Sequence, residues 1–386
     1  MKFLDQLARL NPRKTDRSPL DPRVSKIIDD ALASTGLGRG EAASGGIAAV
    51  IDDALTRAGL RGPVCAPDLV HAPIQPRAAA APAARADAPE SAGQAQGQFL
   101  ARSFAGPAGT LAYKVYVPAG YAADASRRFP LLVMLHGCTQ SPDDFAAGTR
   151  MNALADRHGL LVAYPAQSTN ANGSKCWNWF RPQDQVRGMG EPALIAGVTA
   201  QVRADYRVDP ARIYVAGLSA GAAMAVVLGR TYPEVYAAVG VHSGLPYRAA
   251  QDVASAFAAM KGGAVRAPGA RPDGAGPVVP TIVFHGDRDH TVSAANGAAI
   301  VAQLTSAGGH AWAASGQDTG TAASGRTHTR THYSDASGRT VVEDWRVHGG
   351  GHAWMGGSPA GTYTDPQGPD ASAEMLRFFL QHAQAN

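Results

Sequence analysis

The chain of 386 residues has only three cysteines, a nearly balanced charge and no long apolar run. No segment approaches the roughly 20 apolar residues of a membrane-spanning helix, so we expect no transmembrane segment. The net charge of +4 is spread without dense Lys or Arg blocks, and no nucleic-acid motif is present, which argues against a nucleic-acid partner. Asp5, Gln6 and Arg9 interrupt the first apolar stretch, so the sequence predicts no secretory signal and favours the cytoplasm.

The N-terminal quarter differs in composition from the rest of the chain. Residues 1–66 contain a short repeated pattern, Val24 to Leu32 and Ala48 to Leu55, which predicts two short amphipathic helices, each followed by a glycine. They form either a tether or a surface-binding element. Residues 67–98 are rich in Ala and Pro and read as a disordered linker. Residues 99–386 are long enough to form one catalytic domain with a substantial core.

The most informative motif is Gly217-Leu-Ser-Ala-Gly221, with Ser219 at its centre. An apolar strand pattern, Ile213 to Ala216, precedes it and a small-residue helix pattern follows it. A serine on a tight strand-to-helix turn exposes its hydroxyl above a sheet, and the flanking glycines let neighbouring backbone pass closely. A chain with 44 glycines can match such a motif by chance, so the assignment depends on the other segments.

An oxyanion-hole segment precedes the serine. The apolar run from Pro130 to Leu135 has the character of a strand buried on both faces, and it ends in a His-Gly turn. That turn can leave the backbone N–H of Cys138 or Thr139 free to point at an anion, together with the N–H of Ala220. An ordinary strand-to-loop turn is the alternative.

A carboxylate follows the serine, after another buried strand. Asp287 and Asp289 compete for this role, and Asp289 is favoured because it completes a His-Gly-x-x-Asp-x-x-Val pattern. The same stretch, His285 to His290, also approaches a metal-ligand pattern of binuclear hydrolases, but Asp287 replaces one of the histidines. A metal there would leave the serine turn unexplained, so we expect neither a metal nor a cofactor.

The last segment is a glycine-rich loop that contains His348 and His352. We assign His352 as the base for Ser219, oriented by Asp289, and keep His348 as its rival, because sequence cannot fix which histidine reaches the serine. These residue types perform acyl transfer by a serine. The chain order of oxyanion strand, serine, acid and histidine predicts an α/β-hydrolase fold, a mostly parallel doubly wound sheet with a nucleophile elbow.

These motifs together resemble one esterase family, which contains polyhydroxybutyrate depolymerases and feruloyl esterases. The stretches that carry the resemblance run in order from about Phe99 to the C-terminus: Tyr113–Tyr121, Leu135–Gln140, Cys176–Trp179, Gly217–Gly221, His285–Asp289, Gly349–Trp354 and Tyr363–Asp370. The resemblance implies a serine esterase that cleaves carboxylic esters, either a short-chain polyhydroxyalkanoate such as poly(3-hydroxybutyrate) or short acyl esters. A feruloyl or acetylxylan-type carbohydrate esterase is the alternative.

The resemblance also bears on partners and location. A protein of a different class, which coats a polyhydroxyalkanoate granule through its N-terminal helices and hydrolyses esters only incidentally, is a further alternative. The family includes many secreted members, so an extracellular location competes with the cytoplasmic one.

Cysteines and tryptophans near the motifs suggest further roles. Cys138 and Cys176 both flank the site, either as a disulfide or as two buried thiols. Trp177, Trp179 and Trp354 are predicted to form an apolar wall for substrate, with core filling as the alternative for at least one of them.

Overall fold

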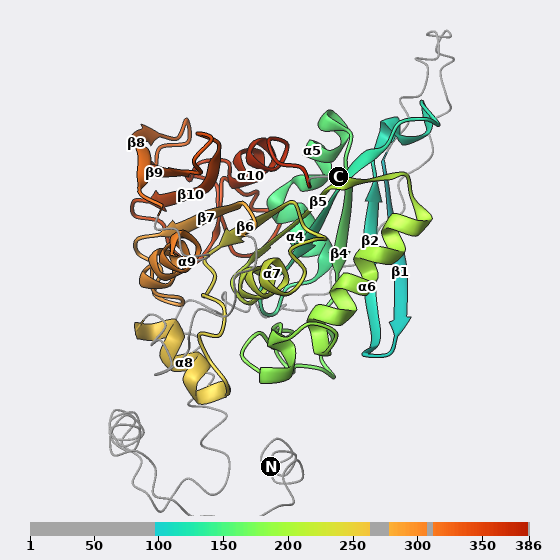
Figure 1. Cartoon of the computed structure of the whole chain (residues 1–386), viewed down its shortest axis with the longest axis horizontal. Helices are drawn as coiled ribbons and strands as arrows, with labels where there is room; N and C mark the ends of the chain where they lie inside the picture. Colours follow the sequence, from blue (N-terminus) through green and yellow to red (C-terminus); the bar gives the residue numbers. More distant parts are fainter. Residues whose placement is uncertain (1–96, 263–277, 307–311, 385–386) are drawn as a thin grey trace, which may run out of the picture. The chain divides into compact units, whose positions relative to one another are not determined.

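The computed structural model describes residues 97–262, 278–306 and 312–384 (Figure 1). The predicted N-terminal helices, within residues 1–66, and nearly all of the predicted linker lie outside the described residues.

A single large sheet of ten strands organises the described part of the chain, in the order β1-β2-β4-β3-β5-β6-β7-β10-β9-β8. The strands of this sheet are β1 (Gln98–Gly106), β2 (Gly109–Val117), β3 (Phe129–Leu135), β4 (Leu161–Pro165), β5 (Val208–Leu218), β6 (Ala238–His242), β7 (Thr281–Gly286), β8 (Ala314–Thr321), β9 (Thr327–Ser334) and β10 (Thr340–Val347). Two short strands, β11 (Trp354–Met355) and β12 (Thr364–Asp365), pair separately.

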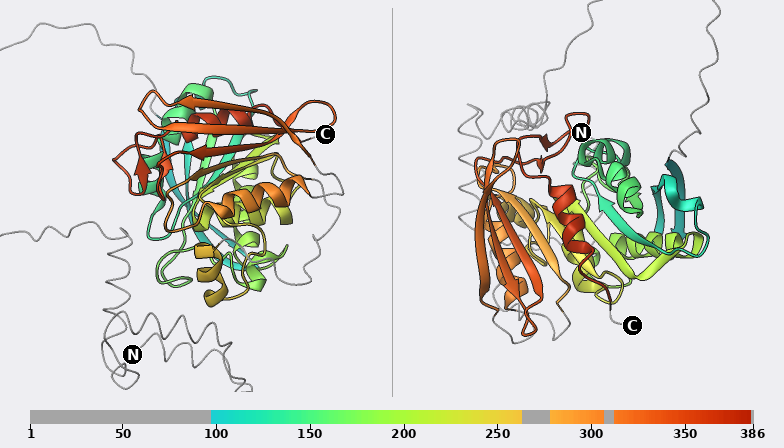
Figure 2. Two further views of the ribbon diagram at one scale, coloured as in Figure 1. Left: turned by 90° about the vertical axis from the view of Figure 1, so that its left-hand side faces the viewer. Right: turned by 90° about the horizontal axis from the view of Figure 1, so that it is seen from above.

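The centre of the sheet is parallel and its edges are antiparallel. Strands β4, β3, β5, β6, β7 and β10 run in one direction, because each pair of neighbours among them is parallel. The pairs β1–β2 and β8–β9 add antiparallel edges at opposite ends of the sheet (Figure 2). The central strands β3, β4, β6 and β7 are buried at every residue, as expected for parallel strands covered on both faces.

Helices cover both faces of this sheet (Figures 1 and 2). The helices, with two 3₁₀ turns, are η1 (Ala119–Ala122), α4 (Pro142–Thr149), α5 (Met151–His158), η2 (Pro182–Gln185), α6 (Gly190–Asp205), α7 (Ala220–Thr231), α8 (Val253–Gly262), α9 (Ala295–Thr305) and α10 (Ala371–Phe379). Helices α6, α7 and α9 pack on one face, and α4, α5 and α10 pack on the other. Two apolar cores result, one on each side of the sheet.

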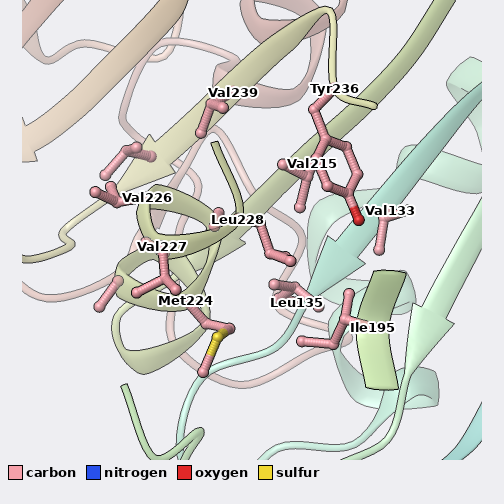
Figure 3. Packing of buried hydrophobic residues seen from close by; sticks show 14 of the residues in the cluster. Val133, Leu135, Ile195, Val215, Met224, Val226, Val227, Leu228, Tyr236 and Val239 are labelled. Carbon is pink, nitrogen blue, oxygen red and sulfur yellow. The ribbon is translucent and has the colours of Figure 1, made fainter. Parts of the chain in front are cut away.

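The core beneath α7 fixes the central strands. Val133 and Leu135 of β3, Val215 of β5, and Met224 and Leu228 of α7 belong to one buried cluster between the sheet and the helix (Figure 3). All five side chains are fully buried, and this burial is a main source of stability for the elements that end at the site. Among the described residues, no helix is long and apolar enough to cross a membrane.

The carboxyl ends of neighbouring strands bring the predicted motifs together. The oxyanion turn follows β3, the serine follows β5, the acid follows β7 and the histidine loop follows β10. Ligands bind at this edge in open α/β sheets. The predicted α/β-hydrolase fold, a mostly parallel doubly wound sheet, is therefore confirmed.

Candidate active site

Ser219 lies on the predicted elbow between β5 and α7. Its backbone has a φ of 57° and a ψ of −120°, a conformation that is strained for a serine and typical of functional turns. A Cβ at Gly221 would overlap the carbonyl oxygens of Leu135 and His136, and one at Gly217 would overlap Gly221. Only glycine fits at both positions, so the spacing of the motif follows from the close contact of β3, β5 and α7.

Asp289 and His352 form a hydrogen-bonded pair across the loops after β7 and β10. His352 Nδ1 lies 2.7 Å from Asp289 Oδ2, and the Asp289 side chain is fully buried. Burial alone would raise the pKa of Asp289, but hydrogen bonds from His285, His352 and the Val292 N–H hold that pKa well below its usual range. The carboxylate therefore stays charged and orients the His352 ring.

Asp287 and His348 form a second pair beside the first. His348 Nδ1 lies 3.0 Å from Asp287 Oδ2, and His348 Nε2 lies 2.9 Å from the hydroxyl of Thr329. Both ring nitrogens of His348 are thus occupied, whereas a base for Ser219 needs one nitrogen available. His352 and Asp289 therefore remain the candidates for the base and the acid. Among the residues that the structure describes, no cluster of three His, Cys, Asp or Glu side chains could hold a metal ion.

His242 connects the serine with the histidine loop. Its carbonyl accepts the Ser219 N–H at 2.9 Å, and its Nε2 accepts the Met355 N–H at 3.1 Å. Burial, with the neighbouring His285 and His352, lowers the pKa of His242 to about 3, so the ring stays neutral and can accept this bond.

The described residues include no hydrogen bond between the Ser219 hydroxyl and His352. Catalytic hydrogen bonds are often long without substrate, so this arrangement remains compatible with a serine and its base.

Two backbone N–H groups are available for an oxyanion. Ala220 is the first residue of α7, so its N–H has no partner within the helix, and the Cys138 N–H has no acceptor in the described part of the chain. The Thr139 N–H, in contrast, donates to the Ser174 carbonyl at 2.7 Å. The prediction that Thr139 can supply an oxyanion donor is therefore wrong, and Cys138 and Ala220 remain the candidates.

His136 fixes the peptide group that carries the Cys138 N–H. Its Nε2 accepts the Gln167 N–H at 3.1 Å, so the proton lies on Nδ1, which donates to the Gly137 carbonyl at 2.7 Å. The Gly137 carbonyl and the Cys138 N–H belong to the same peptide plane, so this bond sets the direction of the donor. Burial lowers the pKa of His136 to about 4, which keeps the ring neutral.

A disulfide and a buried carboxylate support the same turn. Cys138 and Cys176 are bridged, so the disulfide alternative is confirmed. Glu191 accepts hydrogen bonds from the Asn178 N–H at 2.7 Å and from the Gln167 side chain at 2.5 Å. Burial, together with the charge of Asp184, raises the pKa of Glu191 to about 7. Sequence reasoning missed Glu191, because nothing local in the sequence marks its burial.

The three tryptophans do not form an exposed wall. Trp177, Trp179 and Trp354 are 0%, 5% and 1% exposed. The indole N–H of Trp177 donates to the His136 carbonyl at 3.1 Å, and the indole N–H of Trp354 donates to the Ser372 hydroxyl at 2.9 Å. The prediction that they bind substrate is contradicted by this burial. Trp177 instead supports the oxyanion turn from inside, and Trp354 supports the histidine loop.

Known proteins resemble this chain in sequence and in fold. The family model described as Esterase PHB depolymerase matches residues 111–329. Poly(3-hydroxyalkanoate) depolymerase C of Paucimonas lemoignei is 37% identical over 266 residues, which cover 67% of this chain and 60% of the relative. Poly(3-hydroxybutyrate) depolymerase of Ralstonia pickettii is 29% identical over 271 residues, 67% of this chain and 54% of the relative. Feruloyl esterase B of Neurospora crassa is 36% identical over 129 residues, 33% of this chain and 42% of the relative.

The chain thus spans 60% or less of the length of these relatives. Among solved structures, an acetyl xylan esterase from Aspergillus awamori shares the fold, with a TM-score of 0.58 and 18% identity over 74% of this chain and all of that one. Because the family model matches more than half of the 386 residues, the chain belongs to the Esterase PHB depolymerase family.

Proposed function

We propose that this protein is a serine esterase that hydrolyses carboxylic esters through an acyl-enzyme intermediate. The observation that carries the proposal is the buried Asp289–His352 pair beside the strained Ser219 turn. Polyhydroxyalkanoate and polyhydroxybutyrate depolymerases among the relatives support the choice of ester substrates.

The geometry supports a two-step mechanism. His352 removes the proton of the Ser219 hydroxyl as its oxygen bonds to the ester carbonyl carbon, and the carbonyl oxygen becomes an oxyanion held by the N–H groups of Cys138 and Ala220. The imidazolium, stabilised by Asp289, then protonates the leaving alcohol as the ester bond breaks. Water attacks the acyl-enzyme with His352 again as base, which releases the acid and restores Ser219.

The substrate we favour is a short-chain polyhydroxyalkanoate, such as poly(3-hydroxybutyrate), or a short acyl ester. A feruloyl or acetylxylan ester is the second candidate, because relatives named for these activities also match. The third candidate, a granule-coating protein with incidental hydrolysis, rests on the two helices predicted within residues 1–66.

Ser219→Ala in the chain of 386 residues tests these proposals. We expect kcat on a soluble butyrate ester to fall on the order of 10⁵- to 10⁶-fold, because the nucleophile is lost, while Ser126→Ala, at an exposed turn, keeps full activity. Initial rates on 3-hydroxybutyrate oligomers, a butyrate ester and methyl ferulate rank the substrates; comparable rates on all three would reject the polyester preference.

The same variant also addresses granule binding. Loss of turnover with unchanged partitioning onto polyhydroxyalkanoate granules would show that the chain binds the surface independently of hydrolysis. An active Ser219→Ala variant would overturn the esterase mechanism itself.

A further inference from the structure

A short segment, Gly361–Asp365, links the two halves of the candidate site. We call it the bridging segment. It meets the histidine loop through β12, which pairs with β11. The Trp354 N–H donates to the Tyr363 carbonyl at 2.7 Å, and the Gly356 N–H donates to the Asp365 carbonyl at 2.8 Å. Trp354 is two residues after His352, so the bridging segment supports the loop that carries the base.

The same segment also contacts the oxyanion turn. The Tyr363 hydroxyl lies 3.2 Å from the Thr139 hydroxyl, and the Gln140 side-chain amide donates to the Thr362 carbonyl at 3.1 Å. Gln140 in turn accepts the Gly137 N–H at 2.8 Å. One short segment thus holds both the turn that supplies the Cys138 N–H and the loop that supplies His352.

The direction of the Tyr363 hydrogen bond follows from the number of protons. The Thr139 hydroxyl has one proton and donates it to the Cys138 carbonyl at 2.6 Å. Thr139 is therefore the acceptor in its contact with Tyr363, and the phenol is the donor. This chain of bonds runs from Tyr363 through Thr139 to the backbone of Cys138.

Backbone strain indicates that this arrangement is imposed by its surroundings. Thr139 has a φ of 66° and Tyr363 a φ of 52°, both in the left-handed region that non-glycine residues rarely occupy. Such conformations persist where neighbouring contacts determine them, and they cluster at active sites. Ser219, with a φ of 57°, is the third strained residue of the site.

We propose that Tyr363 is a positioning residue of the oxyanion hole. Through Thr139, it holds the Cys138 carbonyl, in the peptide that follows the Cys138 N–H. Together with the bond from His136 to the Gly137 carbonyl, it fixes Cys138 from both sides and keeps its N–H in register with Ser219 and His352. The inference rests on the proposed esterase function. A misplaced donor weakens binding of the tetrahedral oxyanion more than binding of the ground-state ester, so the loss should fall on kcat.

Tyr363→Phe tests this role, because it removes one hydroxyl and keeps the ring. We expect kcat/KM on a soluble butyrate ester to fall roughly three- to tenfold through kcat, the size of one lost hydrogen bond, with KM nearly unchanged. The inhibition constant of an alkyl boronic acid, which forms a tetrahedral adduct with the serine, should rise by the same factor. Tyr247→Phe is the matched control, because its phenol donates to the Gln185 carbonyl at 2.6 Å and, among the described residues, makes no hydrogen bond to either loop of the site.

A double-mutant cycle that combines Tyr363→Phe with Thr139→Val tests whether Tyr363 acts through the Thr139 hydroxyl. Valine is β-branched like threonine, so the backbone strain is similar. If Tyr363 acts through Thr139, the double variant loses no more than Thr139→Val alone, and Thr139→Ser, which keeps the hydroxyl, retains activity.

Three results would overturn the role of Tyr363: wild-type kcat in Tyr363→Phe, a change in KM alone, or fully additive losses in the cycle. An active Ser219→Ala variant would instead reject the esterase mechanism, so the two failures are distinguishable.

Discussion

Two carboxylates and two imidazoles lie in the loops after β7 and β10, and their surroundings separate their roles. Asp289 is fully buried and His352 is 10% exposed, whereas the side chains of Asp287 and His348 are 35% and 40% exposed. Asp287 also accepts the Gly349 N–H at 2.7 Å, so this outer pair joins the two loops at their bases. We interpret the buried Asp289–His352 pair as the one that takes part in catalysis. The more exposed Asp287–His348 pair supports the two loops.

Asparagine substitutions at the two acids should differ sharply. Asp289→Asn cannot hold the required tautomer of His352, so we expect kcat on a butyrate ester to fall about 10⁴-fold. Asp287→Asn removes one hydrogen bond to an exposed histidine and should change kcat only a few-fold. Steady-state rates at one pH check both; similar losses in the two variants would contradict the assignment.

Short motifs located the candidate residues Ser219, Asp289 and His352 better than they located the residues that surround them. Ser219 could be found because its turn needs glycine at fixed positions, a local requirement that sequence records. Trp177 and Trp354 could not be placed, because a tryptophan near a motif can face solvent or the core, and only tertiary packing decides. The same holds for Thr139, whose N–H is occupied by Ser174, a residue far along the chain.

At the level of elements, the buried parallel strands were predictable and the edge strand β8 was not. Strands β3 and β7 are continuous apolar runs, which is typical of strands covered on both faces. Strand β8 has the sequence ASGQDTGT, with two glycines and no apolar alternation, so only its pairing with β9 defines it. The element that supports the site most directly is the turn after β3.

Removing the disulfide should weaken the fold around this turn. Cys138 and Cys176 are 38 residues apart, so the bridge restricts the unfolded chain and should contribute about 3–4 kcal/mol. We expect Cys138→Ala/Cys176→Ala to lower the free energy of unfolding in urea by this amount. The wild-type protein in excess reductant should show the same loss, and an unchanged unfolding midpoint would refute the contribution.

For the molecule as a whole, buried neutral histidines make stability depend on pH. His382 is 2% exposed, and neither of its ring nitrogens has a hydrogen-bond partner among the described residues. Burial lowers its pKa to about 4. In the unfolded chain, His382 takes up a proton below about pH 6.5, whereas in the folded chain it does so only below about pH 4. Stability that is present above pH 6.5 is therefore lost as the pH falls.

His382→Phe should remove the part of the pH dependence of stability that comes from His382. Phenylalanine cannot take up a proton and keeps the packing against Phe378, whose ring centroid lies 4.5 Å from that of His382. We expect the fall in unfolding free energy between about pH 7.5 and about pH 5 to be smaller by about 2 kcal/mol in the variant. Urea unfolding at both pH values measures the difference, and parallel curves for the two proteins would exclude His382 as a source.

The burial of α7 from Ala220 to Gly229 limits how this protein can change. Every residue from Ala220 to Gly229 is buried, and Gly221 lies against the end of β3 with no room for a side chain. A substitution in α7 that changed the position of the Ser219 hydroxyl would therefore also disrupt the packing of the core. Adaptation to a new ester must instead come from the connections around the carboxyl edge of the sheet, which can lengthen or change sequence while the serine stays in place.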